Sequence, residues 1–128
     1  MNDLFSMSDA CGLLSRLGVT ANYRGFFQTA YAVQLCVEDP GRLQQLTSRL
    51  YPEVAKQYNT NWRAIERNIR TVSSVIWRKN RPLLEQLACG PLFIKPTPTQ
   101  LLAVLSTSQL LAQEPHPLPP KTIYQDKE

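Results

Sequence analysis

The sequence predicts an all-α protein of about six or seven helices that contains a helix-turn-helix and is winged-helix-like. First, no stretch of the 128 residues alternates apolar and polar residues over the length of a strand. Second, apolar residues recur with helical spacing between capping residues, glycines and prolines. Third, a short helical segment, a polar break and a long basic helical segment follow one another within residues 51–81.

The N-terminal part is expected to form two helices. Ser8 can cap a helix that runs through Leu17, with Gly18 just beyond its end. Asn22 can cap a second helix, which stops at residues 39–41, Asp-Pro-Gly. This second helix is apolar over most of its circumference, so we expect it to be central and largely buried.

Residues 42–58 are expected to form two further short helices. The segment 42–50 places Leu43, Leu46 and Leu50 on one helical face. Pro52 then suits the first turn of a helix over 51–58, where its missing N–H costs nothing. Asn59-Thr60-Asn61 interrupts the helical pattern, and Thr60 or Asn61 can cap the helix that follows.

Residues 61–79 form the long basic helix. At ~100° per residue, successive spacings of three and four residues produce one narrow apolar seam. The seam consists of Trp62, Ile65, Ile69, Val72 and Ile76. A polar face lies nearly opposite and consists of Arg63, Arg67, Arg70 and Ser74, with Glu66 at its edge.

The C-terminal part is expected to hold two more helices and a tail. Residues 82–89 form a short helix ended by Gly90-Pro91, and 92–94, Leu-Phe-Ile, form a buried anchor or a brief extended piece. Thr97-Pro98 opens a last helix through about Gln113. Its apolar anchors are Leu101, Leu102, Leu105, Leu110 and Leu111. We therefore expect one helical domain over 1–113, with the helix-turn-helix at 51–80, and a flexible proline-rich tail over 114–128.

The polar face of the basic helix has two interpretations. A surface helix usually carries its charges outside, so the arginines can form a solvated face. However, three arginines share this face with a single acid, whereas solvated helices tend to mix signs. Arginine is also the side chain best suited to bind guanine O6 and N7. Glu66 can accept from cytosine N4 or hold Arg63 or Arg70 in place.

The distribution of positive charge favours a nucleic-acid partner, and the apolar runs are too short to predict a membrane span. The net charge is +4, and the basic residues concentrate in the long helix and just beyond it. No apolar run approaches the ~18–20 residues of a membrane span. The N-terminus carries Asp3 where a signal peptide would carry lysine or arginine. We expect a cytoplasmic protein without a membrane partner.

Catalysis and metal binding are not expected. Cys11, Cys36 and Cys89 are widely spaced and predicted to be buried or half-buried thiols in a reducing compartment. The only histidine, His116, lies in the proline-rich tail. No nucleophile elbow, phosphate loop or ligand cluster appears, so the sequence predicts neither an enzyme nor a cofactor.

Four strings of the sequence resemble one known family. Residues 50–60 read LYPEVAKQYNT, 65–70 read IERNIR, 17–25 read LGVTANYRG and 95–97 read KPT. Together they resemble the C-terminal DNA-binding domain of the stage 0 sporulation protein A family, the response regulator that governs entry into sporulation in endospore-forming bacteria. The similarity spans about residues 8–111.

The resemblance implies an all-α helix-turn-helix domain that binds short operator elements, with two protomers on tandem sites, and RNA polymerase as a further partner. The family's glutamate and the arginine after it match Glu66 and Arg67, and its next arginine matches Arg70. The family's first arginine matches Ala64, and Arg63 is the candidate replacement. Thr71 stands at the family's histidine position. The family's N-terminal receiver cannot be built from Asp3 and Asp9, so we expect an excised or stand-alone effector domain.

The leading hypothesis is a sequence-specific DNA-binding transcriptional regulator with helix 61–79 in the major groove. The candidate base contacts are Arg63, Glu66, Arg67 and Arg70. The candidate phosphate contacts are Thr60, Asn61, Ser74, Arg78 and Lys79. The alternative is a receiverless helical interaction module that pairs with a full-length relative through the region of Phe26, Phe27 and Tyr31 or through the last helix.

Overall fold

This computed structural model describes residues 5–112, and every regular element in that range is a helix. The all-α prediction is confirmed, and no β-hairpin wing follows the helix-turn-helix within that range. Nor does any helix of that range have the length and apolar character needed to cross a membrane. The elements are α1 (Met7–Arg16), α2 (Gly25–Glu38), the 3-10 helix η1 (Pro40–Gln44), the π-helical turn η2 (Leu46–Leu50), α3 (Tyr51–Gln57), α4 (Trp62–Lys79), α5 (Arg81–Ala88) and α6 (Pro98–Ala112).

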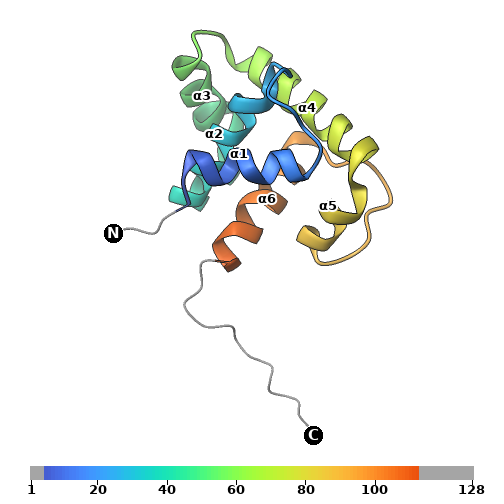
Figure 1. The fold of residues 1–128 in the computed structure, drawn as a ribbon. Helices are drawn as coiled ribbons and strands as arrows, with labels where there is room; N and C mark the ends of the chain where they lie inside the picture. The colour runs from blue at the N-terminus through green and yellow to red at the C-terminus, as the bar shows by residue number, and fades with distance from the viewer. Residues whose placement is uncertain (1–4, 113–128) are drawn as a thin grey trace, which may run out of the picture.

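Helix α2 is the centre of the fold, as its apolar circumference predicts. It packs against α1, α4 and α6, and the three surround it in Figure 1. The start of α2 lies unusually close to the middle of α4. A Cβ atom on Gly25 would lie 2.6 Å from the backbone oxygen of Asn68, so only glycine fits at this crossing. The buried Asn68 Nδ2 also donates to Gln28 Oε1 at 2.9 Å, which orients α4 on α2.

Two predicted N-caps are wrong. Helix α1 is capped by Ser6 instead of Ser8: Ser6 Oγ accepts from the Asp9 N–H, and the Asp9 carboxylate accepts from the Ser6 N–H. Ser8 has a cysteine three residues later, which cannot complete such a box. Helix α2 begins three residues after Asn22, whose side-chain oxygen accepts from the Thr20 hydroxyl. The predicted stop at Gly18, where φ is +98°, is confirmed.

The continuous helix expected over 42–50 is also wrong. The chain breaks at Gln45, where φ is −136° and ψ is 49°, between η1 and η2. The break accompanies two polar ties. Arg42 binds Glu53 of α3 at 2.8 Å and the Leu35 carbonyl at 2.7 Å, and Arg49 binds Asp39 at 2.8 Å. The predicted apolar face is nevertheless directed inward: Leu46 and Leu50 are buried and Leu43 is half-buried.

The segment between α5 and α6, residues 89–97, is more exposed than predicted. Phe93 is 84% and Ile94 75% exposed, so 92–94 is not a buried anchor; only Leu92 is half-buried. Cys89 is exposed and adopts a left-handed φ of 62° at the end of α5. The segment joins the end of α5 to the start of α6 along the surface instead of filling the core.

Helix α6 starts as predicted. Thr97 Oγ1 accepts from the Gln100 N–H, and Gln100 Oε1 accepts from the Thr97 N–H, which makes a reciprocal cap. Leu101, Leu102 and Leu105 are buried, and Leu110 is half-buried. Leu111 is 60% exposed, because the last turn of α6 extends beyond the core, so its prediction as an anchor is wrong. Gln113, the tail 114–128 with His116, and Asp3 lie outside the described residues.

Candidate nucleic-acid interface

Helices α3 and α4 form the predicted helix-turn-helix. Helix α3 ends at Gln57, and Asn59 takes a left-handed φ of 54°, which asparagine tolerates better than most residues. The Thr60 N–H returns to the Ala55 carbonyl at 2.9 Å and closes the turn. Asn61 then caps α4 by accepting from the Ala64 N–H at 3.0 Å. Of the two predicted caps, Asn61 is therefore the one used.

The apolar seam of α4 is buried as predicted. Ile65, Ile69, Val72 and Ile76 are inaccessible to solvent, while Trp62 at the start of the helix is half-buried. Because these side chains pack in the core, they fix the orientation of α4 about its own axis. The opposite side of the helix therefore faces outward along its whole length (Figure 1).

The outward side of α4 carries the arginines together. Arg63, Arg67 and Arg70 are all exposed. Glu66 lies 3.6 Å from Arg70 in an i,i+4 ion pair, and the guanidinium of Arg63 stacks over the Trp62 ring at 5.1 Å. Of the two roles considered for Glu66, this contact corresponds to holding Arg70. A surface pair of this kind contributes little stability, so Arg70 stays free to exchange Glu66 for another partner.

Tyr51 at the start of α3 is a buried neighbour of this face. It is 2% exposed, and burial together with the Glu66 carboxylate raises the pKa of its hydroxyl to about 12. Tyr51 therefore stays neutral and adds no charge near the Glu66–Arg70 pair.

The predicted phosphate contacts occupy three places. Thr60 and Asn61 are exposed at the start of α4. Ser74 and Arg78 continue the arginine side toward the end of the helix, where Ser74 Oγ also contacts the Arg70 carbonyl at 3.3 Å. Lys79 is exposed but lies roughly 160° around the axis from Arg63 at ~100° per residue. Its Cβ adjoins Gly18 of the α1–α2 loop, where a Cβ would come within 2.7 Å.

Lys95 joins this face, although the sequence did not single it out as a site residue. It comes from the segment 89–97, and its Nζ donates to Ser74 Oγ at 2.8 Å. The only signal in the sequence was the Lys-Pro-Thr string at 95–97, which pointed to a family turn and not to a position beside α4. Arg81, by contrast, adds little to the exposed charge: its guanidinium stacks over Trp77 at 4.0 Å and binds Glu85 at 3.2 Å.

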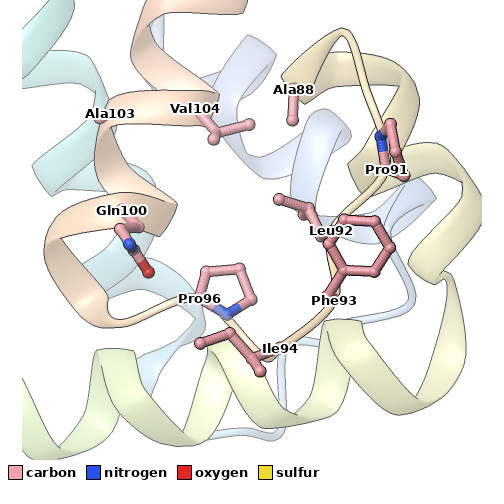
Figure 2. Close-up of a pocket in the computed structure, with 9 residues that line it drawn as sticks. All are labelled: Ala88, Pro91, Leu92, Phe93, Ile94, Pro96, Gln100, Ala103 and Val104. Atoms are coloured by element: carbon pink, nitrogen blue, oxygen red, sulfur yellow. The ribbon is translucent and has the colours of Figure 1, made fainter.

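The other side of the segment 89–97 is apolar. Figure 2 shows Leu92 and Pro96 across from Val104 of α6 in a groove of about 630 Å³, with Ile94 beyond Pro96 at its edge. A second hollow continues from this groove along α6 toward Leu111. Of the aromatic residues considered for a partner surface, Phe26 is buried, Tyr31 is half-buried against Tyr58, and Phe27 is 46% exposed. The last helix and the segment before it thus offer the larger exposed apolar surface.

The comparison with known families agrees with this architecture. Residues 10–108 match the family described as the sporulation initiation factor Spo0A C terminal. The match includes α2, the helix-turn-helix, the segment 89–97 and most of α6, and it covers most of the chain. This protein therefore belongs to the Spo0A C-terminal family of DNA-binding effector domains, as its sequence strings predict.

Proposed function

We propose that this protein is a sequence-specific transcriptional regulator that places α4 in the major groove of double-stranded DNA. The observation that carries the proposal is the division of α4 into a fully buried seam and an exposed arginine face. A helix held in this way presents its charged side chains as a rigid row, and an α-helix fits the ~12 Å width of the major groove.

In this proposal the exposed side chains of α4 divide into two groups. Arg67 and Arg70 bind guanine O6 and N7, with Glu66 restraining Arg70 until the base replaces it. Arg63 contacts a base near the start of the helix in place of an arginine at Ala64. The contacts to the phosphates are made by Thr60, Asn61, Ser74, Arg78 and Lys79, of which Lys79 requires the duplex to reach around the end of α4.

The wider role follows from family membership. We propose that two protomers occupy tandem sites, that RNA polymerase is a further partner, and that the protein acts in the cytoplasm without catalysing a reaction. Residues 5–112 hold no group of three or more His, Cys, Asp or Glu side chains that could bind a metal ion.

The test is selection of bound sites from random DNA, followed by mobility-shift titration with the selected site. The double variant Arg67→Ala, Arg70→Ala is expected to lose about 1–3 kcal/mol of binding free energy for each base contact. Both side chains are exposed, so the thermal midpoint of unfolding should stay unchanged. The control Arg49→Ala removes a positive charge from η2, outside the helix-turn-helix. Its surface ion pair with Asp39 contributes little stability, so this variant should retain sequence preference. A double variant on α4 that binds the selected site as tightly as the unchanged protein would refute the assignment.

A second function is favoured by the apolar groove beside α6. An exposed apolar surface of this kind is typical of a protein-binding site. It would suit an interaction module that pairs with a full-length relative of the family. Gel filtration combined with mobility shifts, with and without such a relative, separates the two functions: a module would change the relative's DNA binding without shifting DNA alone.

A further inference from the structure

The segment 89–97 is tied to the helices behind it near Leu92 and again at Pro96. Glu85 of α5 accepts from the Leu92 N–H at 2.9 Å, while Arg81 donates to the Leu92 carbonyl and to Glu85. At the other tie, the buried Ser73 Oγ donates to the Pro96 carbonyl at 2.7 Å. The segment is therefore held against the last turns of α4 although it has no regular secondary structure.

Lys95 lies between these two ties and faces the arginine side of α4. Its Nζ donates to Ser74 Oγ at 2.8 Å, one helical turn beyond Arg70 and one turn before Arg78. The partner is a neutral hydroxyl, and no carboxylate of residues 5–112 forms an ion pair with Lys95. The ammonium thus remains exposed, with no ion-pair partner among these residues, beside the polar side of α4.

We propose that the segment 89–97 is a second DNA-contacting element, in which Lys95 binds the phosphodiester backbone beside the groove that receives α4. This inference rests on the proposed function and adds an element outside the helix-turn-helix.

A phosphate is the expected ligand for three reasons. Lysine carries a compact point charge without the planar fork that reads a base edge. Lys95 reaches the flank of α4 from a neighbouring segment, whereas the middle of the exposed side is occupied by Arg67 and Arg70. When a helix lies in the major groove, the two backbones run along its flanks, so a cation at the flank meets phosphate oxygen before it meets a base.

The test is the salt dependence of DNA binding by the full chain with Lys95→Gln. One lost phosphate contact should reduce the slope of log K against log salt by about 0.9. The affinity for the selected site and for unrelated DNA should fall by similar factors, on the order of threefold or more, because a phosphate carries no sequence information. Lys95→Arg should retain the slope, and the charge-matched control Arg49→Gln on η2 should leave it unchanged.

Two results would overturn the inference. In the first, the Lys95→Gln variant binds DNA with an unchanged salt slope while the Arg67→Ala, Arg70→Ala variant no longer binds the selected site. This result would leave the proposed function intact and remove Lys95 from the interface. Alternatively, Lys95→Gln can lower the thermal midpoint and the affinity together without changing the slope; Lys95 would then only tether the segment to Ser74. If the unchanged protein itself shows no DNA binding, the proposed function fails first, so the two failures are distinguishable.

Discussion

Helix α4 and the segment 89–97 lie side by side on the proposed DNA-facing side, yet different forces position them. Helix α4 is held by four solvent-inaccessible aliphatic residues with helical spacing, together with its Asn61 cap. The segment is held by individual hydrogen bonds from Ser73, Arg81 and Glu85, and its own large apolar side chains, Phe93 and Ile94, face solvent. A periodic apolar face can thus position an element through packing, whereas an irregular segment depends on a few polar ties.

The largest effect is expected where packing positions α4. Ile69→Ala should lower the free energy of unfolding by about 2–5 kcal/mol, because the buried site cannot collapse fully around the smaller side chain. Urea denaturation measures the loss, and Ile69→Val should cost only ~0.5–1.5 kcal/mol. A loss below that of the valine variant would mean that the seam does not determine the position of α4.

A smaller effect is expected where a single polar tie positions the segment. Ser73→Ala leaves the Pro96 carbonyl without its buried donor and should cost about 1–3 kcal/mol in urea denaturation. It should also weaken DNA binding through displacement of Lys95.

The matched control for this tie is Ser106→Ala. Ser106 is also buried, but its hydroxyl donates to Leu102, whose carbonyl already accepts a helical hydrogen bond. The Ser106→Ala variant should therefore lose less free energy of unfolding than the Ser73→Ala variant. Equal stability of the Ser73→Ala variant and the unchanged protein would show that the segment is positioned by something other than this bond.

The smallest effect is expected at the apolar tip of the segment. Phe93→Ser should change the free energy of unfolding by no more than about 0.5 kcal/mol, because the side chain is 84% exposed. Phe26→Ser, at a 4% exposed position in α2, is the contrasting variant and should be strongly destabilising. A loss above ~1 kcal/mol for Phe93→Ser would show that Phe93 packs in solution and that the two regions differ less than the structure indicates.

Local signals predicted most of α4 and its surroundings. The seam, the break at 59–61, the cap at Asn61, the proline at the start of α3 and the Thr97 cap of α6 all follow from spacing or from side chains a few residues apart. The grouping of Arg63, Arg67 and Arg70 on one face follows from the same helical period. The candidate base contacts were therefore placed together by sequence reasoning alone, and their binding to DNA stays a prediction.

One error was local: Asp9 completes a capping box with Ser6, three residues earlier, and so decides between Ser6 and Ser8 as the cap of α1. The other errors arose where more distant residues are involved. The break at Gln45 accompanies ion pairs that join η1 to α3 and η2 to Asp39. The exposure of Phe93 and Ile94 depends on the path of the segment 89–97 between α5 and α6, which no periodicity encodes.

By itself, the sequence determined that the protein is helical, that it contains a helix-turn-helix and that one side of its long helix is basic, because each of these properties depends on residues within a few turns of one another. Its shared strings also identified the family. Only the tertiary structure decided which of its possible partners Glu66 pairs with and that Lys95 lies beside Ser74 on the arginine side of α4. The placement of Lys95 depends on hydrogen bonds between residues about twenty positions apart, Ser73 with Pro96 and Ser74 with Lys95, and the spacing of residues along the chain carries no record of such a contact.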